Sequence, residues 1–344
     1  MKRLIIALML ILVPMFGWAE EKKLNVLTTT ADLKSITQGI GREYLNVTSI
    51  CEGYQDPHFA EAKPSFIVNA RKADLFIKIG LELEVGYEPL IIEGSRNPKI
   101  RPGNDGHLDA SEGLLLIEVP TQKVDRSMGD VHPFGNPHYW LDPYNVRLVA
   151  RNINNRLQKL DPVHSEAYQN NYQAFIRRID ETMFGPDAVK AIAVDKLWES
   201  ELSGKLDELI TQTNTSRTAD SQLKLSGWVA RMSPLKGSKI IAFHRSWGYF
   251  TNRFGLIVAG EVEPKPGIPP GPGHLKDLIQ KTKAEDIKAI LMESFYDRKS
   301  ADFVAGQTGA KVLVAALSVG GDESAKDYIS LIDNLITKLT DALK

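Results

Sequence analysis

Three histidines and a glutamate stand where strand-like segments of the sequence end. His58 lies in "YQDPHFAEAKPS", His138 in "NPHYWLDP", and His244 directly after "KIIAF". Glu293 follows the apolar run "IKAILM". Neutral imidazoles and a carboxylate are ligands that suit a tetrahedral, borderline-soft divalent cation, zinc before others. If the fold brings these four side chains together, they form a metal site.

Each of the four residues also has a purely structural interpretation. His58, beside a proline, is compatible with an ordinary loop position, and His138 with a helix cap or with packing under Trp140. His244, at the end of an apolar strand, is compatible with a hydrogen-bonded core histidine, and Glu293 with a capping carboxylate. Only their joint placement at strand ends favours metal binding over these alternatives.

The remaining histidines carry a weaker signal. His132 precedes His138 by six residues, a spacing that suits an auxiliary ligand or a gate at the same site. Three others stand in polar or helical segments that we assign to the surface: His107, His164 and His274. We expect these three to lie outside the metal site.

Positioning the candidate ligands requires strands that end at one edge of a sheet. Apolar, strand-like runs alternate with helical stretches in both halves of the chain, which predicts an α/β fold with parallel sheets and helical crossovers. Proteins with such sheets bind ions and small molecules at the carboxyl ends of the strands, where the candidate residues lie. The predicted strands are 24–29, 46–51, 74–80 and 113–119 in the first half, and 239–243, 255–260, 287–293 and 310–316 in the second.

A long helix is predicted between the two halves. Asp161 is a suitable N-cap, Pro162 is tolerated in a first helical turn, and Gly185 stops the helical pattern. The chain is therefore expected to consist of an N-terminal lobe (20–160), a connecting helix (161–184) and a C-terminal lobe (185–344).

The N-terminal segment "MKRLIIALMLILVPMFGWA" has basic residues, then an apolar run, then small residues up to Ala19. This is the layout of a secretory signal peptide over residues 1–19. The apolar run is shorter than the roughly 20 residues that a membrane span needs. Because no cysteine stands near the predicted cleavage point, we expect a soluble periplasmic protein without a lipid anchor.

The composition excludes several classes of site. A formal net charge of −1 offers no basic field for nucleic acid. The single cysteine, Cys51, excludes an intrachain disulfide and a cysteine-based zinc site. Histidines and carboxylates are left as the candidate metal ligands.

The motifs around the candidate residues resemble those of a known family. "DPHFAEAKPS", "NPHYWLDP", "FHRSWGYFTNRFGL" and "EVEPKPGIPPGPGHL" occur in the order typical of the periplasmic zinc- and manganese-binding proteins of ABC importers, the ZnuA/TroA-like solute-binding family. The resemblance covers essentially the whole mature chain. It implies two (β/α) lobes joined by one rigid backbone helix, with the metal in the cleft between the lobes.

The resemblance also implies a set of ligands. The family's motifs place three of them at His58, His138 and His244, and the third is His in zinc members and Glu in manganese members. The fourth is often an Asp in a late segment that reads "ALSVGG" here, where Leu317 stands at the Asp position. Glu293 is the candidate replacement, and water is the alternative.

The predicted function is capture of a divalent metal ion in the periplasm and its delivery to the membrane permease of an ABC importer. The three imidazoles favour Zn²⁺ over Mn²⁺. We expect a monomer that is not an enzyme and binds no nucleic acid. Two alternatives are a secreted zinc-dependent hydrolase, with Glu293 as general base, and a metal-binding adhesin of the same fold. No HExxH motif supports the hydrolase.

Overall fold

The computed structural model describes residues 22–124, 129, 131–265 and 267–343. The predicted signal peptide, residues 1–19, lies outside the described residues. Among the helices of the described part, none has the length and the apolar character needed to cross a lipid bilayer.

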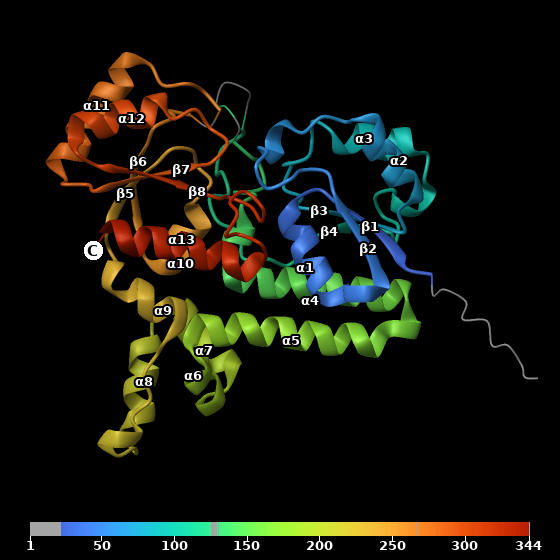
Figure 1. Cartoon of the computed structure of the whole chain (residues 1–344), viewed down its shortest axis with the longest axis horizontal. Coiled ribbons are helices and arrows are strands. Elements are labelled where there is room, and N and C mark those ends of the chain that lie inside the picture. Colours follow the sequence, from blue (N-terminus) through green and yellow to red (C-terminus); the bar gives the residue numbers. More distant parts are fainter. Residues whose placement is uncertain (1–21, 125–128, 130, 266, 344) are drawn as a thin grey trace, which may run out of the picture.

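Two four-stranded parallel sheets form the centres of two lobes (Figure 1). The strand orders, β2-β1-β3-β4 and β6-β5-β7-β8, follow the same pattern, and this confirms the predicted α/β class. Parallel neighbours need crossover connections, which the helices supply. The strands are β1 (Leu24–Thr28), β2 (Leu45–Ser49), β3 (Leu75–Lys78), β4 (His107–Asp109), β5 (Lys239–Ala242), β6 (Ile257–Glu261), β7 (Ala289–Glu293) and β8 (Lys311–Ala315).

Amphipathic helices cover these sheets. The last helix, α13 (Tyr328–Leu343), buries Leu331, Leu335 and Leu339 on one face, which is the spacing of a helix that packs against a core. The helices of the N-terminal lobe are α1 (Ala31–Gly41), α2 (Pro64–Lys72) and α3 (Glu88–Ser95), and those of the C-terminal lobe include α10 (Gly248–Phe254), α11 (Pro272–Ala284) and α12 (Lys299–Thr308).

The fourth strand was predicted at the wrong place. The segment 113–119 is irregular, and the shorter strand β4 lies before it. The side-chain amide of Asn145 donates to the carbonyl of Leu115, and its oxygen accepts from the Leu115 N–H, each at 3.0 Å. An apolar run whose backbone groups bond a side chain has no need of a sheet neighbour.

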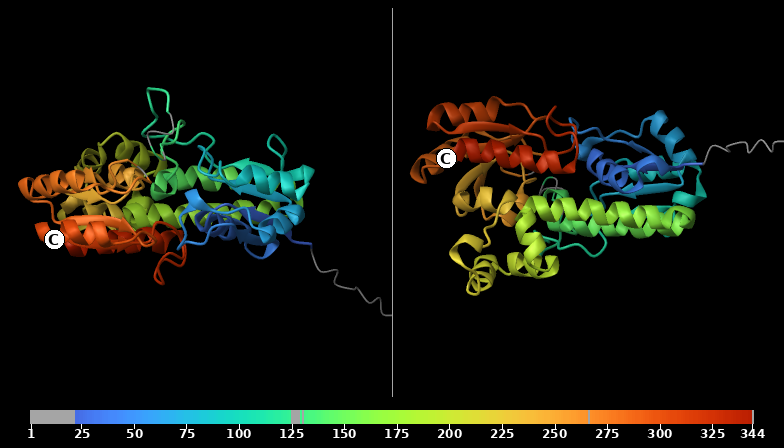
Figure 2. Two further views of the ribbon diagram at one scale, coloured as in Figure 1. Left: turned by 90° about the horizontal axis from the view of Figure 1, so that it is seen from above. Right: turned by 60° about the horizontal axis from the view of Figure 1, so that its bottom comes forward.

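Two antiparallel helices run beneath the N-terminal lobe, and the second reaches the C-terminal lobe (Figure 2). They are α4 (Pro143–Leu160) and α5 (Ser165–Phe184), separated by a 3₁₀ turn at Pro162–His164. The predicted connecting helix therefore begins at Ser165, after this turn. Twenty residues extend about 30 Å, and α5 contacts α1 at one end and α9 (Gly227–Met232) at the other.

A group of short helices projects from the C-terminal lobe below α5 (Figure 1). They are α6 (Pro186–Ala191), α7 (Val194–Leu202) and α8 (Leu206–Asn214). Arg253 of α10 holds this group in place through Glu201 of α7, at 2.7 Å. The same guanidinium binds both carboxylate oxygens of Asp142, the N-cap of α4, at 2.7 and 2.8 Å. A buried, bidentate arginine pair of this kind fixes the geometry of all three helices.

Hydrogen bonds also join the two lobes directly. Trp140 Nε1 donates to the carbonyl of Leu317 at 2.9 Å. The N–H of Val319 donates to Asp32 Oδ1 at 2.9 Å. The segment after β8, where the family's aspartate was expected, therefore ties the C-terminal lobe to the N-terminal one.

Asp32 gives this contact a dependence on pH. Burial raises the pKa of Asp32 from 3.8 to about 6, and its bonds to Val319 and Ser318 oppose the shift only in part. A raised pKa means that the folded chain favours the protonated acid, so stability is lost as pH rises from about 4 through 6. The shift corresponds to about 3 kcal/mol.

Replacing Asp32 by Asn, which cannot ionise, is expected to remove this loss. The free energy of unfolding of Asp32→Asn, relative to wild type, should rise by about 3 kcal/mol between pH 4 and pH 7. Urea denaturation of metal-depleted protein measures the difference, with the exposed Asp220→Asn as control. A difference that does not change with pH would contradict the interpretation.

Candidate metal centre

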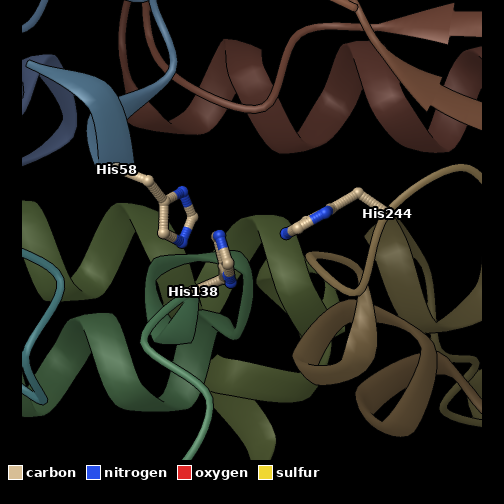
Figure 3. A group of neighbouring side chains, drawn as sticks. All are labelled: His58, His138 and His244. Atoms are coloured by element: carbon tan, nitrogen blue, oxygen red, sulfur yellow. The ribbon is translucent and has the colours of Figure 1, made fainter. Parts of the chain in front are cut away.

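The three predicted histidines meet between the lobes (Figure 3). His58 lies in a 3₁₀ turn after β2, His138 begins the 3₁₀ turn Tyr139–Leu141, and His244 lies just beyond β5. Each offers one ring nitrogen, and these nitrogens lie within 4.8 Å of one another. In the parallel sheet β6-β5-β7-β8, the order in which the chain adds strands reverses between β5 and β7. Open parallel sheets place ligands at the carboxyl ends of the strands beside such a point.

Two of the rings are held by the same local structure. Asp56 Oδ1 accepts from the N–H of His58 at 2.9 Å and from its Nδ1 at 2.8 Å. Asn136 Oδ1 accepts from the N–H and the Nδ1 of His138 at the same two distances. In each motif, Asp-Pro-His and Asn-Pro-His, the first residue therefore orients the third. With Nδ1 as donor, the lone pair on Nε2 is left for a metal.

The third ring is held from a different segment. Glu263 Oε2 lies 2.7 Å from His244 Nδ1 and also accepts from the N–H of Gly267 at 2.9 Å. His244 and Glu263 are both almost fully buried. A carboxylate that accepts from Nδ1–H fixes the ring and makes its other nitrogen a stronger ligand.

The Nε2 atoms of His58 and His138 are buried and have no hydrogen-bond partner. Buried polar atoms without a partner cost free energy unless something else binds them. Zn–N distances of about 2.0–2.1 Å would place the centres of two bound rings about 5 Å apart. The observed separations are 5.2 Å for His58 and His138, 5.8 Å for His58 and His244, and 6.1 Å for His138 and His244. The geometry fits one small cation.

The protonation of the rings differs. Burial lowers the pKa of His138 well below its usual value, and the neighbouring imidazoles add to this effect. Burial also disfavours the charged form of His244, but Glu263, Glu293 and Asp56 outweigh it and raise the pKa of His244. His138 is therefore ready to bind a cation, whereas a metal must compete with a proton at His244.

Glu293, the predicted fourth ligand, ends β7 and is completely buried. Neither carboxylate oxygen makes a hydrogen bond within the described structure. Burial raises the pKa of Glu293 to about 7, against the opposing charge of His244. The structure thus places Glu293 near His244 but outside the group of three close nitrogens, and its role as a ligand stays a prediction.

Other residues correct or extend the expectations. His107 is buried in β4 and bonds Glu88 at 2.9 Å, so its assignment to the surface was wrong. The residues that orient the rings were not identified from the sequence. The repeated Asx-Pro-His pattern could have revealed Asp56 and Asn136, but no local signal connects Glu263 to a histidine that precedes it by 19 residues.

Comparison with known proteins identifies the family of this chain. The family described as "ZnuA: Zinc-uptake complex component A periplasmic" matches residues 26–183 and 209–342. This chain belongs to the ZnuA family. The unmatched stretch, 184–208, contains α6 and α7.

The relatives found by sequence comparison include proteins named for zinc and proteins named for manganese. The high-affinity zinc uptake system protein ZnuA of Bacillus subtilis is 23% identical over 336 residues, which cover 95% of this chain and 90% of that protein. The manganese ABC transporter substrate-binding lipoprotein PsaA of Streptococcus pneumoniae is 22% identical over 325 residues, covering 93% and 89%.

Solved structures share the fold. A crystal structure of ZnuA superposes with a TM-score of 0.67 at 21% identity, covering 94% of this chain and all of that one. A manganese-bound periplasmic metal-binding protein from Candidatus Liberibacter asiaticus gives 0.64 at 21% identity, with the same coverage.

Membership of the ZnuA family decides the class of function. The chain is an extracytoplasmic metal-binding component of an ABC importer. The family consists of solute-binding proteins without catalytic activity, which sets aside the hydrolase alternative.

The carboxylate behind His244 should contribute to metal affinity. Glu263→Gln keeps the shape of the side chain but removes the charge that makes the His244 ring a stronger metal ligand. We therefore expect zinc affinity to fall at least about tenfold. Competition titration against a chromophoric chelator measures the change. The exposed Glu323→Gln removes a charge elsewhere in the same lobe and should leave affinity unchanged. Equal affinities for both variants would show that Glu263 does not support the ligand.

Proposed function

We propose that this protein captures Zn²⁺ in the periplasm and delivers it, as a monomer, to the permease of an ABC importer. One observation supports the proposal above all. Three imidazoles have their Nδ1 atoms engaged by oxygen acceptors and their remaining nitrogens within 4.8 Å of one another. This is the arrangement by which proteins prepare histidines for a metal ion.

The choice of zinc over manganese rests on the ligand atoms. Imidazole nitrogen suits zinc, whereas manganese prefers carboxylate and other oxygen ligands. The carboxylates Asp56 and Glu263 bind ring N–H groups and so act behind the histidines. Glu293 is the oxygen ligand that the sequence predicts for the fourth position.

Delivery is favoured by the origin of the ligands. His58 and His138 belong to the N-terminal lobe, and His244 belongs to the C-terminal lobe. A small separation of the lobes would break the coordination sphere without unfolding either sheet. Contact with a permease could therefore release the ion.

The test combines capture with delivery. Purified chain is exposed to equal free concentrations of Zn²⁺ and Mn²⁺, and elemental analysis is expected to find about one zinc per chain. The loaded protein is then added to the permease and ATPase reconstituted in proteoliposomes, where zinc uptake is measured. A chain that retains manganese in preference to zinc contradicts the choice of metal. Zinc capture without stimulated uptake contradicts delivery and favours the adhesin alternative.

A further inference from the structure

A fourth imidazole, that of His132, adjoins the three that the motifs supply. Its ring centre lies 5.3 Å from that of His58, almost the same separation as between His58 and His138. With His138 and His244, but without His58, it also lines a partly open pocket of about 30 Å³. A space of that volume holds about one water molecule.

The ring of His132 resembles those of His58 and His138, because one nitrogen is hydrogen-bonded and the other is free. Nε2 is buried and has no hydrogen-bond partner. The backbone of Leu81 hydrogen-bonds the ring and favours its protonated form, which identifies the Leu81 carbonyl as acceptor. Since Nε2 is free, Nδ1 is the donor. A backbone carbonyl is one of the usual partners of a metal-binding histidine.

The Leu81 carbonyl is held by an unusual turn. Gly80, Leu81 and Glu82 have φ values of 82°, 55° and 66°. This is a left-handed backbone conformation that residues other than glycine rarely adopt. Buried Glu84 stabilises this turn, because its carboxylate accepts from the N–H groups of Ile79 and Gly80 at 2.6 and 3.0 Å. Strained backbone persists where surrounding contacts fix it, and it is frequent at functional sites.

A second turn, in the segment that contains His132, positions the His132 ring from its own backbone. The N–H of Gly135 donates to the carbonyl of His132 at 3.3 Å, and Gly135 has a φ of 113°. A side chain at Gly135 would come within 3.0 Å of the Ile117 carbonyl. Glycine at this position therefore lets the turn lie close to the 113–119 segment, with His132 facing the site.

We propose that His132 is the fourth ligand of the metal, which makes an all-imidazole site. This inference rests on the proposed function and names a ligand that the family motifs do not supply. His132 is not in the group of nitrogens within 4.8 Å of one another, so this assignment requires the His132–Gly135 turn to move toward the ion on binding. Four nitrogen ligands would increase the preference for zinc over manganese.

The competing ligand is Glu293, which lies near His244 and also outside that group. The two assignments predict different coordination spheres: four nitrogens for His132, and three nitrogens with one oxygen for Glu293 or water. X-ray absorption of the zinc-loaded protein distinguishes them, because imidazole rings give characteristic outer-shell scattering. Four imidazoles are expected in the wild type and three in His132→Ala.

Affinity measurements supply the second readout. His132→Ala should weaken zinc binding at least tenfold and manganese binding much less, so the zinc preference should fall by about the same factor. His274→Ala removes an imidazole that bonds the Glu261 carbonyl instead, and should change neither value.

Each result assigns the ligand. Three imidazoles in the wild type, with unchanged spectra and affinity in His132→Ala, would overturn the inference but leave the proposed function intact. A loss of zinc affinity in Glu293→Gln, with three imidazoles retained, would then identify Glu293 as the ligand. A wild-type chain that binds no zinc would instead contradict the proposed function itself.

Discussion

Alanine at His58, His138 or His244 is expected to weaken zinc binding at least tenfold, which corresponds to about 1.4 kcal/mol. The largest loss should occur for His138, because its ring is buried, neutral and fully oriented before the metal arrives. Competition titration against a zinc chelator gives the affinities. Each variant should remain folded, since both lobes have apolar cores that do not include these rings.

His274→Ala is the matched control for these variants. It removes an imidazole of the C-terminal lobe that lies outside the group of three, and it should bind zinc like the wild type. Circular dichroism separates loss of a ligand from loss of the fold. A folded variant at any of the three positions that binds zinc normally would remove that residue from the site.

Zn²⁺ is expected to stabilise the protein far more than Mn²⁺ does. A ligand that binds only the folded state adds about 2.7 kcal/mol to its stability when present at a hundred times its dissociation constant. Since the close ligand atoms are three ring nitrogens, the dissociation constant should be much smaller for zinc. Thermal denaturation at matched free metal concentrations measures the two shifts.

His244→Glu provides the converse variant for this comparison. It places a carboxylate where His244 now bonds Glu263, and so should reduce the stabilisation by zinc and increase that by manganese. The exposed Asp220→Asn should shift neither. Equal stabilisation of the wild type by both ions would show that the imidazoles do not determine the choice of metal.

The sequence predicted the sheets because their strands are short apolar runs, bounded by polar turns. Seven of these runs become strands close to their predicted positions. The eighth, 113–119, fails because Asn145, about thirty positions away, provides backbone partners that no local pattern reveals. Burial of His107 was missed for the same reason, since its partner Glu88 comes from a different element.

The candidate site was predictable as far as its residues carry local motifs. Asp-Pro-His and Asn-Pro-His each combine a candidate ligand with the residue that orients it, so His58 and His138 could be recognised from short segments. The positions of Glu263 and His132 depend on long-range packing: on the close approach of β6 and β5, and on the left-handed turn at Leu81. Contacts between residues so far apart in the chain leave no periodic pattern in the sequence.

The hydrogen bonds from Trp140 to Leu317 and from Val319 to Asp32 have a kinetic consequence. They join the lobes through groups that do not bind metal, so they can form in the empty and in the loaded protein alike. We expect both forms to present similar outer surfaces and so to compete for the same permease. Zinc uptake should pass through a maximum as carrier is added at fixed zinc, because surplus empty carrier occupies the permease. The loaded fraction of the carrier, more than its abundance, would then control the flux of metal into the cell.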